Sequence, residues 1–179
     1  SFDDALRDRF AAWMRHPRVV AVGETGLDLY RDRASLADQM SALDWHLRQA
    51  DETGLPLVFH CRQAYDELLG ALEARGTCVR GVMHCFSGTV EDAARALALG
   101  LHLGFDGPVT YKKAQLTREI ARTCPADRML LETDCPYLPP EPHRGRRNEP
   151  AYLPLIAAAV ASARGKTVEQ VAMQTTRNA

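Results

Sequence analysis

Four hydrophobic runs of this sequence each end on a side chain that can ligate a metal ion. The runs lie at 19–24, 56–60, 79–84 and 129–134, and they end at Glu24, His60, His84 and Asp134. Apolar runs of this kind predict buried parallel strands, whose carboxyl ends meet at one face of an α/β fold. Imidazole and carboxylate together are the donor set that zinc, manganese and iron use in hydrolytic sites. The four endings therefore predict a metal site.

The carboxylates at these strand ends need a cation to be stable there. Glu24, Glu132 and Asp134 all follow apolar runs, and an unpaired buried carboxylate costs several kcal/mol in lost hydration. A divalent ion offsets that cost, and it also lowers the pKa of a bound water towards ~7. The residue types therefore indicate hydrolysis by metal-activated water. A single histidine at a strand end is more often a structural residue, so the prediction depends on the set.

The surrounding residues favour a phosphoester as the substrate. Arg62 shares the strand face of His60, and a guanidinium matches a phosphate through two hydrogen bonds. Other candidate substrate-binding residues are Ser87, Lys112, Arg144 and Arg147. Each basic residue alone is more simply a solvated surface residue, and only together, around a metal, do they favour phosphate.

Strand parity predicts that three cysteines lie on the strand face opposite to the predicted ligands. Cys61, Cys85 and Cys135 each follow a predicted ligand and therefore face away from it. We expect them to be small buried apolar residues under the helices. The sequence has five cysteines, an odd number without a C-x-x-C pair, which favours a reducing compartment over a disulfide framework.

Strand and helix signals alternate along the whole chain. Strands are expected near 19, 56 and 79, and at 101–105 and 129–133. The expected helices are 3–14, 35–54, 64–74, 89–100, 114–123, 153–164 and from 167 onward, with a Pro- and Arg-rich loop at 136–150. Ser35, Thr89 and Thr167 each precede an Asp or Gln by three residues, a pattern that predicts a capped helix start, and Gly54 predicts the end of the second helix. This alternation predicts an α/β fold with a parallel sheet, in one domain covering 1–179. A closed eight-stranded barrel usually needs ~250 residues, so the chain lacks roughly three units of a barrel or forms an open sheet.

Composition restricts the functional class. The chain has 179 residues, is 46% hydrophobic and carries a net charge of −1 with a pI near 6.6, so any polyanion must be bound by a local basic patch or by metal ions. No apolar run reaches the ~18 residues of a membrane span, and no signal peptide is recognisable. We expect a soluble cytoplasmic protein without a membrane partner.

Several of these phrases together resemble the TatD family of metal-dependent deoxyribonucleases. They are GETGLD at 23–28, FHCR at 59–62, HCFSG at 84–88, LGFDG at 103–107, LETDCPYL at 131–138 and RGRRNEP at 144–150. The resemblance implies a TIM-barrel hydrolase of the amidohydrolase type that cuts DNA, often as an exonuclease. It also implies two divalent metal ions of the zinc, manganese, magnesium or nickel class.

The resemblance further implies roles for individual residues. Glu24 resembles a carboxylate that bridges two metals, and His60 and His84 resemble ligands of one metal. Asp134 resembles the ligand of the other metal and the partner of the attacking water. The family's first strand ends in a His-x-His pair that this sequence lacks. The five strands then correspond to about the last five of eight, and the Glu24, His60 and His84 site keeps its protein ligands.

Three functions remain open at this point. The first is metal-dependent hydrolysis of DNA, with Asp134 and Glu24 as catalytic residues. The second is hydrolysis of another ester or amide on the same barrel, because a fold does not determine a substrate. The third is a non-catalytic metal-binding or partner-binding fragment that self-associates through an open sheet edge.

Overall fold

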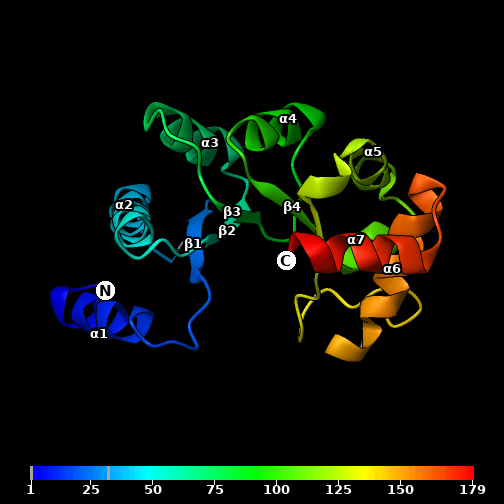
Figure 1. Cartoon of the computed structure of the whole chain (residues 1–179), viewed down its shortest axis with the longest axis horizontal. Coiled ribbons are helices and arrows are strands. Elements are labelled where there is room, and N and C mark those ends of the chain that lie inside the picture. Colours follow the sequence, from blue (N-terminus) through cyan, green and yellow to red (C-terminus); the bar gives the residue numbers. More distant parts are fainter. Residues whose placement is uncertain (1, 32) are drawn as a thin grey trace. The chain divides into compact units, whose positions relative to one another are not determined.

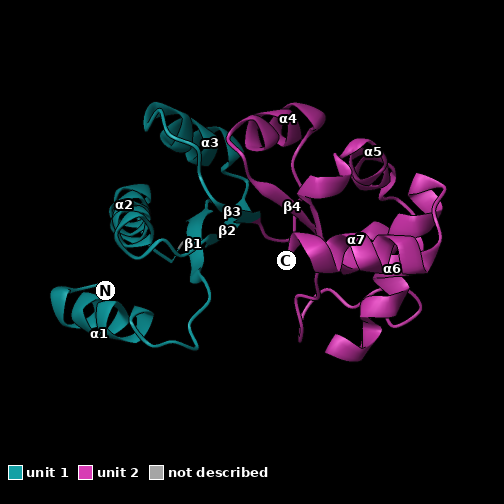
Figure 2. Ribbon diagram, in the orientation of Figure 1, with its two compact units in different colours: residues 1–82 teal, residues 83–179 magenta. Residues whose placement is uncertain are grey.

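The computed structural model describes residues 2–31 and 33–179, which divide into two compact units (Figure 2). Unit 1 is residues 1–82 and unit 2 is residues 83–179. Helices and strands alternate in both units (Figure 1), as the sequence predicts. The single domain over 1–179 stays a prediction.

Unit 1 is built from two paired parallel strands and the helices around them. Its elements are α1 (Asp4–Met14), β1 (Val22–Asp28), α2 (Leu36–Thr53), β2 (Leu57–Arg62) and α3 (Tyr65–Ala74), and β3 (Gly81–Met83) lies at the boundary with unit 2. Sequence signals explain the bounds of α2: the side chain of Ser35 accepts a hydrogen bond from the N–H of Asp38, and Gly54 ends the helix in the left-handed conformation. The expected helix and its caps are confirmed.

Strand β1 begins later than the sequence predicts. The apolar run starts at Val19, but pairing begins at Val22, opposite Leu57, and the side chain of Val20 is 76% exposed. The amide of Val19 bonds instead to the carbonyl of His16 in a turn. A β-branched run forms a strand only where a partner strand lies beside it, so the expected start near 19 is wrong.

A bulge in β1 falls at Glu24. Gly23 pairs with Val58 and Thr25 pairs with Phe59, so Glu24 has no partner residue on β2. A bulge re-aims the side chain of its extra residue. Glu24 is therefore exposed while Thr25 is buried, and Glu24 lies within the strand rather than at its end.

Strand β2 is confirmed with the predicted alternation. Leu57, Phe59 and Cys61 are buried, whereas His60 and Arg62 are partly exposed. Phe2, which precedes α1, packs against two rings of α2, with its ring centroid 5.1 Å from that of Trp45 and 5.0 Å from that of His46.

Unit 2 repeats the strand–helix alternation. Its elements are α4 (Val90–Ala98), β4 (His102–Phe105), the 3-10 helix η1 (Gly107–Thr110), α5 (Gln115–Thr123), η2 (Ala126–Arg128), β5 (Met129–Leu131), η3 (Pro150–Tyr152), α6 (Leu153–Arg164) and α7 (Val168–Asn178). Strands β4 and β5 are parallel, with Leu103 opposite Met129 and Phe105 opposite Leu131. The expected strand 129–133 stops at Leu131, because β4 ends at Phe105.

Long polar side chains fix the helices of unit 2 to one another. The guanidinium of Arg164, in α6, donates to the carbonyl of Cys124 at 2.8 Å and so binds the end of α5. The amide of Asn178, in α7, donates to the carbonyl of Met129 in β5 at 2.8 Å. Capping boxes begin α4 at Thr89 and α7 at Thr167, as the Thr-x-x-Asp and Thr-x-x-Gln patterns predict.

The three cysteines after the predicted ligands do not share one environment. Cys61 is buried, as expected, but Cys135 is exposed. Cys85 is partly buried, and its thiol donates to Asp106 Oδ2 at 3.1 Å. The expectation of buried apolar cysteines is therefore wrong for Cys135, because β5 has already ended and strand parity no longer applies there.

Candidate functional site

In unit 1, two carboxylates lie against the imidazole of His60. His60 Nδ1 is 3.8 Å from Glu24 Oε2, and His60 Nε2 is 3.4 Å from Asp28 Oδ2. The bulge brings Glu24 to the imidazole from β1, and Asp28 is the last residue of the same strand. The predicted ligands Glu24 and His60 are therefore brought together, with Asp28 as an additional neighbour.

In unit 2, two carboxylates lie against His84 in the same way. His84 Nδ1 is 2.9 Å from Glu132 Oε2, a hydrogen-bond distance, and His84 Nε2 is 3.6 Å from Asp134 Oδ1. Glu132 also accepts the N–H of Cys85 at 2.5 Å. The predicted ligands His84 and Asp134 are therefore brought together. Glu132 holds the imidazole of His84 on the side opposite to Asp134.

These pairs have the chemistry of a metal-binding histidine with an orienting carboxylate. A ligating histidine commonly donates its second N–H to a carboxylate, as His84 can to Glu132. Two donors at about 2.1 Å from one tetrahedral ion lie about 3.4 Å apart, close to the His84–Asp134 separation. The donors present therefore suit a divalent ion.

The donors occur as pairs rather than as complete coordination shells. Across residues 2–31 and 33–179, no three His, Cys, Asp or Glu side chains lie in an arrangement that could hold a metal ion. The metal ligands thus stay a prediction that the donor pairs support.

Two acidic residues around the predicted ligands have shifted pKa values. Burial opposes the ionisation of Asp28, but the backbone N–H groups of Arg31 and Tyr30 and the nearby His60 outweigh it and lower its pKa. Burial raises the pKa of Asp106 to about 7, against the effect of the hydrogen bond from Cys85, and the charge of Glu132 raises it further. Burial also raises the pKa of the Cys85 thiol far above its usual value, so Cys85 stays protonated.

The predicted substrate-binding residues lie in four places, one in unit 1 and three in unit 2. Arg62 lies in unit 1, with its guanidinium 3.8 Å from the centre of the Tyr30 ring. In unit 2, the guanidinium of Arg144 lies 4.3 Å from the centre of the Tyr111 ring, and Lys112 follows Tyr111 in the sequence and is exposed. Ser87 is exposed just before α4.

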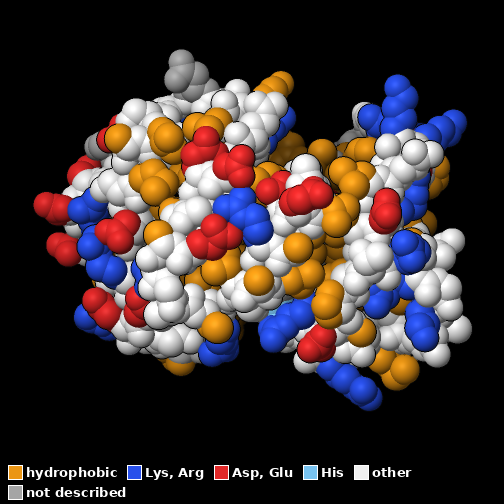
Figure 3. All heavy atoms as spheres, turned by 90° about the horizontal axis from the view of Figure 1, so that it is seen from above, with side chains coloured by type: hydrophobic (Ala, Val, Ile, Leu, Met, Phe, Trp, Pro, Cys, Tyr) orange, Lys and Arg blue, Asp and Glu red, His pale blue; other side chains and the backbone are white. Residues whose placement is uncertain are grey.

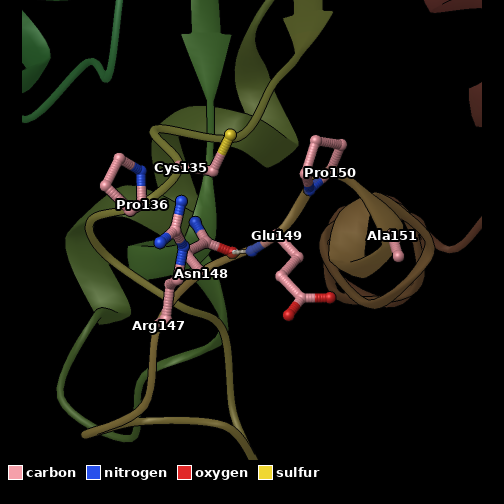
Figure 4. A pocket seen from close by; sticks show the side chains of 7 residues that line it. All are labelled: Cys135, Pro136, Arg147, Asn148, Glu149, Pro150 and Ala151. Carbon is pink, nitrogen blue, oxygen red and sulfur yellow. Dashed lines mark hydrogen bonds between the residues drawn. The ribbon is translucent and has the colours of Figure 1, made fainter.

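Arg147 lines a pocket of about 390 Å³, which is also lined by Cys135, the residue after Asp134. Its other lining residues are Cys135, Pro136, Asn148, Glu149, Pro150 and Ala151 (Figure 4). The buried Asn148 holds this loop, since its side chain donates to the carbonyl of Tyr137 at 2.6 Å and accepts the N–H of Glu149 at 2.8 Å. In Figure 4 the Arg147 guanidinium extends beside Asn148.

Three further acidic residues, which have no site role in the sequence prediction, lie at or near these pairs: Asp28, Asp106 and Glu132. Glu132 was recognised only as a carboxylate that needs a cation. Asp28 and Asp106 end the phrases GETGLD and LGFD, and an acidic residue after an apolar run was the available signal.

Comparison with known proteins gives a consistent family. A family model described as TatD related DNase matches residues 1–179. An uncharacterized metal-dependent hydrolase of Bacillus subtilis, YabD, is 39% identical over 173 residues, which are 94% of this chain and 68% of the relative. The 3'-5' ssDNA/RNA exonuclease TatD of Klebsiella pneumoniae is 40% identical over 184 residues, covering 99% of this chain and 70% of that protein.

Solved structures show the same likeness. The TatD homologue YjjV of Escherichia coli K12 matches 98% of this chain, and 69% of its own, with a TM-score of 0.92 and 32% identity. A TatD family hydrolase of Entamoeba histolytica matches 89% of this chain, and 62% of its own, with a TM-score of 0.79 and 26% identity. These likenesses confirm the predicted α/β fold of the TIM-barrel type. The correspondence to the last five of eight units stays a prediction.

Proposed function

Because this chain belongs to the TatD-related DNase family, a family of hydrolases, we propose that it hydrolyses phosphodiester bonds of DNA with divalent metal ions. The observation that carries the proposal is the pairing of each predicted histidine ligand with two carboxylates, at His60 and at His84. A histidine that has one carboxylate to orient its ring and a second carboxylate to share an ion is more typical of a metal site than of a structural role.

We assign the metal ligands as Glu24 and His60 in unit 1 and His84 and Asp134 in unit 2. A divalent ion bound there supplies Lewis-acid polarisation of the phosphoryl oxygen and a lowered pKa for water. The carboxylate of Asp134 would accept the proton of the attacking water, and Glu132 would keep the His84 ring in its orientation. Glu24 contributes a second carboxylate charge that a cation must balance.

The basic residues balance the charge of the phosphate. Arg62 and Arg144 each lie over a tyrosine ring, which restricts the guanidinium without using its N–H donors. Those donors can then bind phosphate oxygens in the ground state and in the transition state. Lys112, Arg147 and the Ser87 hydroxyl contribute in the same way in unit 2.

The first test is the metal content of the chain by elemental analysis, for the wild type and for His60→Ala. We expect about one metal ion per chain or more in the wild type, and a clear loss in the variant, because a missing ligand lowers affinity. His16→Ala is the matched control, since His16 is exposed in the turn after α1. Equal metal content in wild type and His60→Ala would contradict the assignment.

A second function is hydrolysis of another ester or amide. It is favoured by the fact that the B. subtilis relative is named only as a metal-dependent hydrolase. Under the phosphodiester proposal, Arg62→Ala and Arg144→Ala reduce cleavage of DNA much more than cleavage of a neutral ester. Equal losses on both substrates would favour the second function.

Two finer proposals concern partners and location. We propose that an unpaired strand edge allows self-association, which sedimentation at several concentrations tests; a monomer at all concentrations would contradict it. All five cysteines are free, which supports the reducing cytoplasm as the location. No helix in the described ranges is long and apolar enough to cross a membrane.

A further inference from the structure

An exposed tyrosine lies beside the predicted metal ligand of unit 1. The Tyr30 side chain is 58% exposed, although an aromatic ring of this size is usually covered. The guanidinium of Arg62 lies 3.8 Å from the ring centre, in van der Waals contact with one ring face. The exposed part of the Tyr30 side chain is available to a ligand.

The same carboxylate holds Tyr30 and faces His60. Asp28 Oδ1 accepts the N–H of Tyr30 at 2.9 Å and the N–H of Arg31 at 3.0 Å. Asp28 Oδ2 lies 3.4 Å from His60 Nε2. The N–H of Leu29 also donates to the carbonyl of Arg62 at 3.0 Å, so the segment after β1 is fixed to the end of β2. A ligand on Tyr30 therefore lies next to the groups that face His60.

We propose that Tyr30 is a base-stacking residue, which holds the nucleobase next to the phosphodiester bond that is cut. This inference rests on the proposed function. The Tyr30 and Arg62 side chains offer a flat ring beside a cation, and a nucleotide carries a flat base beside an anionic phosphate. Base–aromatic stacking tolerates every base, because each base has a π face. Tyr30 thus binds nucleotides without selecting a sequence.

Comparison with two similar pairs in this chain separates Tyr30 from a merely structural tyrosine. Tyr111, under Arg144, is only partly exposed, and its hydroxyl donates to the carbonyl of Pro139 at 3.0 Å, so that ring supports a loop. Trp13 is 51% exposed with Arg9 5.2 Å from its ring centre, but it lies on α1, where no ligand is predicted. Tyr30 alone of the three rings combines exposure with a position beside a predicted ligand.

Binding of a fluorescent oligonucleotide tests the proposal without requiring catalysis. The probe is a short single-stranded phosphorothioate oligothymidylate that carries 2-aminopurine at one end, each end in turn, because stacking quenches this base. We expect the wild type and Tyr30→Phe to quench it, and Tyr30→Leu to bind about tenfold more weakly without quenching. Trp13→Leu is the matched control and should behave as wild type.

A second binding test uses an oligonucleotide whose terminal nucleotide lacks its base. Removing the base should weaken wild-type binding as much as Tyr30→Leu does, and the two changes together should cost no more than either alone. If Tyr30→Leu binds and quenches as the wild type does, or if the two losses add in full, the proposal is wrong.

Cleavage of the matching phosphodiester oligonucleotide distinguishes this proposal from the proposed function. Cleavage by the wild type and by Tyr30→Leu at the same rate would overturn the role of Tyr30 and leave the hydrolase. Quenching that depends on Tyr30, without any cleavage, would support the role of Tyr30 and count against the hydrolase. A wild type that neither binds nor cuts would overturn both.

Discussion

At the scale of single residues, the site is a set of imidazole rings whose orientation is fixed by carboxylates. Glu132 is the clearest case, because it lies 2.9 Å from His84 Nδ1 and also accepts the N–H of Cys85. The side chains of His84 and Glu132 are 11% and 19% exposed, so water competes little for this contact. The ring is thereby fixed before a ligand arrives.

Glu132→Gln should therefore weaken metal binding without unfolding the chain. The glutamine oxygen can still accept the N–H of Cys85, but its amide cannot orient His84 as a carboxylate does. We expect metal affinity to fall about 10- to 100-fold, measured by competition with a chelator. Glu91→Gln, an exposed site in the first turn of α4, is the control, and an unchanged affinity in Glu132→Gln would refute an orienting role.

The raised pKa of Asp106 predicts that the stability of the metal-free chain depends on pH. The pKa of this carboxyl rises from 3.8 to about 7, so the folded state holds its proton more tightly than the unfolded state does. The free energy of unfolding should therefore fall as the pH rises from 3.8 to about 7, by roughly 1.4 kcal/mol per pH unit, and then level off.

Asp106→Asn removes this titration and should flatten the difference between pH 4 and pH 7. Denaturant unfolding of both chains over this range, with metal removed, measures it. Asp127→Asn changes an exposed carboxyl in η2 and should leave the slope as in the wild type. The same slope in Asp106→Asn as in the wild type would show that another group carries the effect.

At the scale of elements, Glu132 is the first residue after β5, and its position depends on how closely strand β4 approaches it. A Cβ at Gly104 would overlap the carboxylate of Glu132, so glycine at this place in β4 leaves the room that the carboxylate occupies. The phrase LGFDG thus contributes a space as well as the acidic residue Asp106.

Gly104→Ala should therefore displace Glu132 and release His84. We expect a loss of about 1–3 kcal/mol in the free energy of unfolding, together with weaker metal binding. Gly70→Ala is the control, because no heavy atom lies within 4 Å of a Cβ there. Inside α3, that change should stabilise the chain by about 0.5–1 kcal/mol. Gly104→Ala with unaltered metal affinity would show that Glu132 can shift without consequence.

At the scale of the whole molecule, charge is nearly balanced. The net charge is −1, and the face drawn in Figure 3 carries both acidic and basic side chains rather than a single basic field. Long-range attraction of a nucleic acid is therefore weak. Binding must come from a few local cations and from bound metal.

This balance predicts a shallow salt dependence of DNA binding. If Arg62, Lys112, Arg144 and Arg147 each contact one phosphate, the logarithm of the binding constant for a single strand should fall against log salt with a slope of about −3. Arg62→Ala should reduce that slope by about 0.7, as fluorescence anisotropy at several salt concentrations can measure. If Arg62→Ala leaves the slope unchanged, Arg62 does not contact a phosphate.

Much of the architecture was predictable because it depends on local signals. The cap residues Ser35, Thr89 and Thr167 predicted the starts of three helices, since an N-cap is satisfied within one turn. Alternation in β2 predicted that His60 and Arg62 share a face. The strand limits were less predictable: β1 and β5 are shorter at one end than their apolar runs, because pairing depends on a partner strand.

The sequence by itself determined the residue types of the site, the order of its strands and helices, and the family that the phrases resemble. Only the tertiary structure showed that Asp28 and Glu132 flank the two histidines, that a bulge turns Glu24 towards His60, and that Cys135 is exposed. The physical reason is distance along the chain. Caps and strand parity act between near neighbours, whereas His84, after β3, and Glu132, after β5, are far apart in the sequence and meet only in the folded chain.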